Sequence, residues 1–196
     1  YPPRPEGTKL SPSQGLGAAT QTVTRNNAFD VANISEWQLD ARNRLAQMLG
    51  YTKSEAVPET IAQRGPTTVQ SNRHDLERMT YYLRVRPDTD VPVTTVVRKD
   101  LGGPLPVFIL LAGSTSGVHL GWGEAKVPID HHRLSIGADM ARQAAHRGYL
   151  AICVEQIGYG ERGERDLPKK SPDRTIDVAV HAVLLGQSLQ GLKTMD

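Results

Sequence analysis

The chain has 196 residues, 38% of them apolar, which suits one globular domain with a single core. Its formal net charge of +2 is spread without a long run of like charges, which argues against a nucleic-acid partner or a polybasic membrane surface. No apolar stretch approaches the length of a membrane span, so we expect a soluble chain; the single cysteine, Cys153, is expected to be a buried structural thiol.

The N-terminal part of the sequence predicts an arm followed by a helix. Residues 1–33 are expected to form an extended or disordered arm, because Pro, Gly, Ser, Thr and Gln dominate its composition. A helix is predicted over residues 35–50, with Ser35 and Gln38 as a capping box and Gly50 at its end. Residues 51–71 show no clear period and are predicted to be a connection. The apolar face of the helix comprises Ile34, Trp37, Ala41, Leu45 and Met48.

The middle of the sequence predicts a hairpin and then a βαβ unit. Alternation over residues 81–86, turn residues at 87–90 and a β-rich run at 91–98 indicate an antiparallel hairpin, with an extension around residues 75–79 left open. Residues 106–112 (PVFILLA) and 150–154 (LAICV) read as parallel strands buried on both faces. A crossover helix is predicted over residues 135–147, with Ser135 as its cap and Gly148 at its end.

The last predicted element is an apolar helix over residues 175–192. Two parallel strands would leave this helix little sheet to cover, so we expect the chain to be the front part of a larger fold. Further strands would come from a downstream segment or from another chain. The buried stripe of the helix is predicted to contain Ile176, Val180, Val183, Leu184 and Gly191.

Ligands of such sheets bind beyond the carboxyl ends of the strands, here residues 113–123 and 156–165. The second loop contains Gly158, Gly160 and Gly163 in the dinucleotide spacing G-x-G-x-x-G. The acidic residues and the proline that follow oppose both a phosphate and the start of a helix, so no nucleotide cofactor is predicted.

Histidines near this site raise the question of a metal. His119, Asp130, His131 and His132 lie close in sequence, but adjacent histidines point apart and no fourth ligand has the spacing for tetrahedral zinc. We therefore predict structural or exposed histidines and no metal. His181 is likewise predicted to be a helix-surface or packing residue.

The order of these segments resembles the opening half of the α/β-hydrolase fold, and more narrowly its acetyl xylan esterase-like and dienelactone hydrolase-like members. The resemblance covers residues 34–196. It implies an α/β fold in which an antiparallel hairpin leads into a parallel central sheet flanked by helices, present here as an incomplete N-terminal portion. The segments that carry it are SEWQLDARNRLAQMLG, PVFILLAGSTSG, the GWG at Gly121 to Gly123, RGYLAICVEQIGYGERGER and HAVLLGQSLQGLKTMD.

The resemblance implies that the loop after the first parallel strand forms part of an oxyanion hole. Gly113 would let the substrate approach the backbone, and the N–H of Ser114 or Thr115 would face the developing charge. Ala112 departs from the family, in which His is usual, and the alternative is a flexible strand-to-helix loop. Trp122 is interpreted as lining a pocket or filling the core. Glu155, Gln156 and Arg162 are candidate substrate-binding residues, with internal ion pairing as the alternative.

The catalytic Ser, acid and base of the resembled family have no matching positions in this chain. The segment GSTSG at residues 113–117 resembles a nucleophile elbow but has Thr115 at its centre, and no base can be named beside it. The function implied is a serine-dependent hydrolase of short acyl esters of carbohydrates or small molecules. Its partners would be the ester substrate and the remainder of the fold, without which we expect the chain to be inactive. The alternative is a non-catalytic α/β-hydrolase-like binding or scaffold module.

Overall fold

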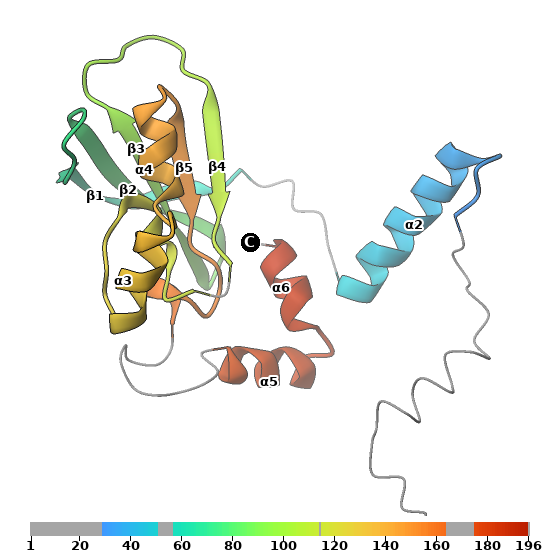
Figure 1. The fold of residues 1–196 in the computed structure, drawn as a ribbon. Helices are drawn as coiled ribbons and strands as arrows, with labels where there is room; N and C mark the ends of the chain where they lie inside the picture. The colour runs from blue at the N-terminus through green and yellow to red at the C-terminus, as the bar shows by residue number, and fades with distance from the viewer. Residues whose placement is uncertain (1–28, 51–56, 114, 164–174, 196) are drawn as a thin grey trace, which may run out of the picture. The chain divides into compact units, whose positions relative to one another are not determined.

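The computed structural model describes residues 29–50, 57–113, 115–163 and 175–195, and the chain divides into two compact units, 1–45 and 46–196 (Figure 1). Most of the predicted N-terminal arm lies outside the described residues. The predicted helix is confirmed as α2 (Ile34–Leu49), which begins in the first unit and ends in the second. Gly50, with φ of 66°, follows its last residue. Ser35 is not the cap, because the helix begins one residue before it.

The second unit is a mixed α/β structure built on a five-stranded sheet in the order β1-β2-β3-β5-β4. Strands β1, β2, β3 and β5 pair antiparallel in turn, whereas β5 and β4 pair parallel. The pairing therefore changes from antiparallel to parallel at β5, which has β3 on one side and β4 on the other. The strands are β1 (Glu59–Val69), β2 (Leu76–Arg86), β3 (Thr89–Arg98), β4 (Val107–Leu111) and β5 (Leu150–Val154).

The predicted hairpin is confirmed as β2 and β3, and the proposed extension near residues 75–79 is part of β2. The connection predicted over residues 51–71 is wrong for 59–69, which form β1; residues 51–56 lie outside the described part. Nearly all of β1 is exposed, and it contains a Gly-Pro pair. Because an exposed edge strand needs no apolar alternation, its sequence carries no period that could reveal it.

The crossover between the parallel strands is more divided than predicted. It contains the 3₁₀ turn η1 (Val118–Trp122), helix α3 (Pro128–Ser135) and helix α4 (Met140–His146). The prediction that Ser135 caps the crossover helix is wrong, because Ser135 is the last residue of α3 and Asp139 immediately precedes α4. Gly137, with φ of 91°, lies in the break between the two helices. The predicted end is confirmed by Gly148, with φ of 90°.

The prediction that β4 is buried on both faces is wrong. Leu110 is buried against the crossover, but the side chains on the other face are 52%, 61% and 66% exposed at Val107, Ile109 and Leu111. Among the described residues β4 is the end strand of the sheet, so one edge and one face have no neighbour. An apolar run predicts a buried strand, but only the tertiary structure determines how many faces are covered.

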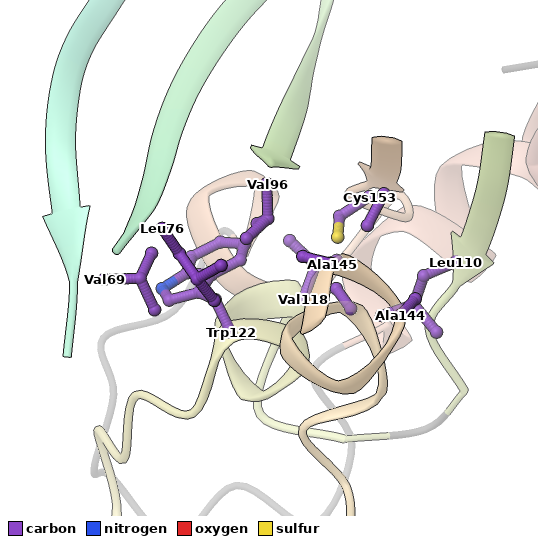
Figure 2. Close-up of a cluster of buried hydrophobic side chains, with 11 residues drawn as sticks. Val69, Leu76, Val96, Leu110, Val118, Trp122, Ala144, Ala145 and Cys153 are labelled. Atoms are coloured by element: carbon purple, nitrogen blue, oxygen red, sulfur yellow. The ribbon is translucent and has the colours of Figure 1, made fainter. Parts of the chain in front are cut away.

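The core lies between the sheet and the crossover (Figure 2). Cys153, on β5, is fully buried, as predicted, and burial raises the pKa of its thiol to about 12. Trp122, at the end of η1, is part of this core, which agrees with the interpretation that it fills the core. The buried members are Val69, Leu76, Val96, Leu110, Val118, Trp122, Ala141, Ala144, Ala145, Ala151 and Cys153.

The single C-terminal helix predicted over residues 175–192 is wrong. It is two helices, α5 (Ile176–Leu184) and α6 (Leu189–Met195), with Gly186 in the break at φ of 70°. The predicted buried stripe of α5 is largely exposed, and its buried residues are Val178 and Ala182. Within the described ranges, no helix has the length and apolar character needed to cross a membrane.

Candidate functional site

Two loops meet beyond the carboxyl ends of β4 and β5, where a ligand site was predicted. The N–H of Gly160 donates to the carbonyl of Ser116 at 3.2 Å, which joins the loop after β5 to the loop after β4. The carboxylate of Glu155 accepts the N–H of Val118, with its two oxygens 3.0 and 3.3 Å away. Arg162 donates to the carbonyl of Glu155 at 3.2 Å. The two loops are therefore fixed to each other by backbone and side-chain bonds.

A buried polar cluster, which we define as Ser116, His119 and Asp130, lies beneath these loops. Ser116 Oγ donates to Asp130 Oδ1 at 2.5 Å, and His119 Nε2 lies 3.1 Å from Asp130 Oδ2 and 3.1 Å from Ser116 Oγ. The three residues are 1%, 2% and 0% exposed. Asp130 lies on α3, whereas Ser116 and His119 belong to the loop and to η1, so the cluster ties the loop after β4 to the crossover.

Asp130 also organises the start of α3. Its Oδ2 accepts the backbone N–H groups of Lys126 at 3.0 Å and Val127 at 3.1 Å. Burial by itself would raise the pKa of Asp130, but bonds from Ser116, the two backbone N–H groups and His119 outweigh it and lower the pKa to about 2. Asp130 is therefore ionised at neutral pH, and every bond to it is strengthened by its charge.

His119 is neutral in this cluster. Burial lowers its pKa, and the bond to Asp130 only partly opposes that effect. A neutral imidazole carries one proton, and Nε2 bears it because Nε2 faces the ionised carboxylate. His119 Nδ1 is buried without a hydrogen-bond partner among the described residues. Because this nitrogen carries no proton it is an acceptor, and an unpaired buried acceptor is less rare than an unpaired buried N–H. A Cβ on Gly117 would approach Nδ1 to 2.7 Å, so this glycine packs on the ring.

The cluster contains the residue types of a catalytic triad without its geometry. In a triad the serine and the carboxylate bind opposite ring nitrogens, and the serine gives its proton to the imidazole. Here Ser116 and Asp130 share His119 Nε2, and the Ser116 hydroxyl donates directly to the carboxylate. Ser116 is also 1% exposed, so its hydroxyl is shielded from a substrate, and the carboxylate that accepts its hydrogen is a weak base because the pKa of Asp130 is about 2. This geometry suits a structural role in which the cluster fixes the loop in place.

Glu155, a predicted pocket residue, lies under the loops at 3% exposure. Burial is the main cause that raises the pKa of its carboxyl to about 7, against the smaller effect of its backbone hydrogen bonds. A Cβ on Gly160 would come within 1.8 Å of the Glu155 carboxylate, so the glycine is required for the loop to cover the acid. The G-x-G-x-x-G motif thus serves packing at Gly160, and its middle residues form the 3₁₀ turn η2 (Gly160–Arg162).

The other predicted site residues differ in their exposure and in their contacts. Gly113 has open space around it, and the Thr115 N–H donates to the Gly113 carbonyl at 2.7 Å, so this donor is already engaged. Ser114 lies outside the described residues. Gln156 is half-buried. Arg162 lines a cavity of about 380 Å³ next to η2, whose other walls include the turn between β2 and β3 and the helices α5 and α6.

Glu161, at the rim of this region, is tied to the outer strands. It accepts the Tyr82 hydroxyl at 2.8 Å and pairs with the guanidinium of Arg64. His181 also lines the cavity beside Arg162. Within the described part of the chain, no group of three or more His, Cys, Asp or Glu side chains is placed to bind a metal ion. His131 and His132 are exposed on α3.

Comparison with known proteins supports the fold and goes no further. A solved structure from Bacteroides fragilis, provisionally named an acetyl xylan esterase, superposes with a TM-score of 0.66 at 20% sequence identity. The match covers 98% of this chain and 50% of that one, so the chain spans about half the length of its structural neighbour. At this identity the likeness concerns the fold alone. No protein-family model and no curated protein sequence matches the chain.

Sequence reasoning missed the buried polar cluster. It treated Ser116 only as a member of an elbow-like segment and treated His119 and Asp130 as candidates for a metal site. A local signal for Asp130 was present, because Pro128 favours the first helical position and an acid two residues later can accept the N–H groups that open a helix. No local pattern indicates Ser116 or His119, since their shared partner lies on a different element.

Proposed function

We propose that this chain is the N-terminal part of an α/β-hydrolase that cleaves short acyl esters of a carbohydrate or small molecule. The observation that carries the proposal is the sheet, in which antiparallel β2 and β3 lead into parallel β5 and β4, with two interlocked loops beyond the carboxyl ends of the parallel pair. The fold-level match to a protein provisionally named an acetyl xylan esterase supports the same direction.

The proposed role of this chain is to supply the oxyanion loop and part of the pocket wall. Gly113, which has open space around it, would admit the acyl group, and the Ser114 N–H would face the developing charge; Thr115 would support the turn. A serine from the remainder of the fold would attack the carbonyl carbon and a histidine there would take its proton. Collapse of the tetrahedral intermediate would then release the alcohol and leave an acyl-enzyme for water to cleave.

The remainder of the fold is proposed to continue from β4. This strand has an unpaired edge among the described residues, and Val107, Ile109 and Leu111 expose an apolar face beside it. A further parallel strand with its helix would pair with the edge and cover the face, which agrees with the neighbour being about twice as long as the matched region. This remainder could be a downstream segment or a second chain, and the same geometry serves both.

Hydrolysis of p-nitrophenyl acetate tests the proposal. The chain alone is expected to release nitrophenolate at the buffer rate, whereas the chain joined to a segment that completes the fold is expected to turn over and to react with a fluorophosphonate probe. Activity in the chain alone that survives Ser114→Ala and Ser116→Ala would overturn this division of roles. A completed protein that neither reacts with the probe nor turns over would also contradict it.

A non-catalytic α/β-hydrolase-like binding module is the second candidate. Two observations favour it: Ala112 stands where the resembled family has His, and the Thr115 N–H is already bonded. In this case the completed protein would bind a carbohydrate or small molecule without cleaving it. Calorimetry with an acetylated xylo-oligosaccharide, together with the same probe, separates the two functions.

A further inference from the structure

A polar cavity of about 450 Å³ lies between α4 and the segment that links β1 to β2. We call it the basic pocket; its main lining side chains are Ser71, Arg73, Asp139, Arg142, His146 and Arg147. Strand register places its β1–β2 wall far from the two loops described above. Leu76 pairs with Arg98, and Val96 pairs with Ala151, so this segment lies at the amino-terminal end of β5. The basic pocket is therefore at the opposite end of the parallel strands from the candidate ester site.

Positive charge in the basic pocket exceeds negative charge. The three lining arginines face a single lining carboxylate, Asp139, which is already engaged by Arg142 Nε at 2.7 Å and by Gln143 Nε2 at 2.7 Å. Arg147 donates to the carbonyl of Gln143 at 3.2 Å, a bond that leaves its charge without a counter-ion. Within the described residues, neither Arg73 nor Arg147 has a carboxylate partner. Two guanidinium charges thus remain uncompensated around one hollow.

His146, which lines the basic pocket, interacts electrostatically with arginines of the same pocket. His146 Nε2 lies 2.9 Å from Ser71 Oγ, and the ring of His146 lies 5.6 Å from that of His74. Burial lowers the pKa of His146, and its electrostatic interactions with His74, Arg73, Arg142 and Arg98 lower it further. Asp100, a carboxylate that interacts electrostatically with His74, is paired with Arg98. The contribution of the arginines to this shift has the sign that also attracts an anion.

We propose that the basic pocket binds a small molecule that carries a phosphate group, with Arg73 and Arg147 donating to the phosphate oxygens. Two unpaired guanidinium groups match the charge of a phosphate dianion, and their planar forks suit its oxygens. The volume lies within the range of small-molecule sites. Because the pocket is at the other end of the sheet, the proposal does not depend on ester hydrolysis by the two loops.

Calorimetry and histidine NMR on the chain test this proposal, with inorganic phosphate as the probe at low ionic strength and pH 7. Saturable binding is expected, together with an increase in the pKa of His146 because the bound anion offsets the neighbouring arginines. The Arg73→Gln and Arg147→Gln double variant is expected to lose about tenfold or more in affinity. Arg84→Gln, which removes an exposed arginine already paired with Asp90, is the matched control and is expected to bind as the native chain does.

Three outcomes would overturn the proposal. One is the absence of saturable binding by the native chain. Another is equal phosphate affinity in the double variant and the native chain. Both substitutions are at exposed positions and are expected to leave the fold intact, which circular dichroism verifies. The third is that chloride at the same ionic strength reproduces the histidine shifts, since that would mean general screening. The affinity for glycerol 3-phosphate, compared with that for inorganic phosphate, then distinguishes a phosphate ester from the free ion as the source of the group, with glycerol as the control that lacks phosphate.

Discussion

The buried polar cluster and the basic pocket lie at opposite ends of the same parallel strands and treat charge in opposite ways. Asp130 is fully buried, and its carboxylate is surrounded by donors from Ser116, His119 and two backbone N–H groups. In the basic pocket Arg73 and Arg147 are exposed, and no described carboxylate pairs with them. In the cluster the buried charge of Asp130 is compensated by donors of the fold, whereas in the basic pocket two exposed arginine charges have no described carboxylate partner.

This difference separates a structural role from a binding role better than residue type does. Ser, His and Asp within hydrogen-bond distance suggest catalysis, yet the Ser116 hydroxyl, the Asp130 carboxylate and His119 Nε2 already bond to one another inside the fold. A buried charge requires such compensation, because removal from water costs several kcal/mol when the charge is unpaired. Solvated arginines pay no such penalty, so the fold can leave them available for a ligand.

Substitution of Asp130 is expected to give the largest effect. Asp130→Asn removes the charge that Ser116, His119 and the backbone N–H groups of Lys126 and Val127 bind, and its amide places a donor among these donors. We expect a loss of about 3 kcal/mol or more in the free energy of unfolding, measured by urea denaturation. Asp90→Asn, at an exposed pair with Arg84, is the matched control and should cost less than about 1 kcal/mol. Equal losses in the two variants would show that the cluster does not stabilise the fold.

The pH dependence of stability is expected to reveal Glu155. Its folded-state pKa of about 7 lies above the ordinary value of 4.5, so the folded protein retains a proton that the unfolded chain releases. Its contribution to stability is therefore complete below pH 4.5 and is lost as the pH rises to 7, at up to about 1.4 kcal/mol per pH unit. Glu155→Gln should remove this loss.

Urea midpoints of the native chain and Glu155→Gln, followed from pH 4 to pH 8, measure the difference. The variant is expected to match the native chain at pH 4 and to exceed it at pH 8. Parallel curves across this range would mean that the Glu155 carboxyl titrates normally in the folded state, and that the cover formed by Gly160 does not exclude water from it.

Gly160→Ala is expected to have the smallest of the three effects. Its φ of 51° disfavours a side chain, and the added Cβ would meet the Glu155 carboxylate at 1.8 Å. Gly103→Ala is the matched control, because φ of 82° imposes the same kind of backbone strain and no atom lies within 4 Å of the added Cβ. Thermal melts should show Gly160→Ala less stable than the control by about 1–3 kcal/mol. A smaller difference would mean that the loop can move away from the acid.

The sequence predicted the helices and strands that have a clear periodic or apolar pattern. The hairpin of β2 and β3 and the strands β4 and β5 are confirmed, because alternation or an apolar run marks a strand; the helix α2 is confirmed by its period although it buries none of its residues. It failed for β1, which is exposed, and for the helix breaks before α4 and between α5 and α6, where glycines with positive φ interrupt otherwise helical patterns. The oxyanion role of Gly113, Ser114 and Thr115 and the binding roles of Gln156 and Arg162 stay predictions.

The sequence by itself determined that two apolar strands would lie in parallel with Gly-rich loops beyond their carboxyl ends, because strand length and crossover length depend on local composition. Only the tertiary structure decided which polar residues those loops would bury, since Ser116, His119 and Asp130 come from three different segments and meet through hydrogen bonds that no spacing encodes. It also decided the basic pocket, where α4 and the β1–β2 segment, about 70 residues apart in the chain, meet because β2 and β3 bring the chain back to the start of β5.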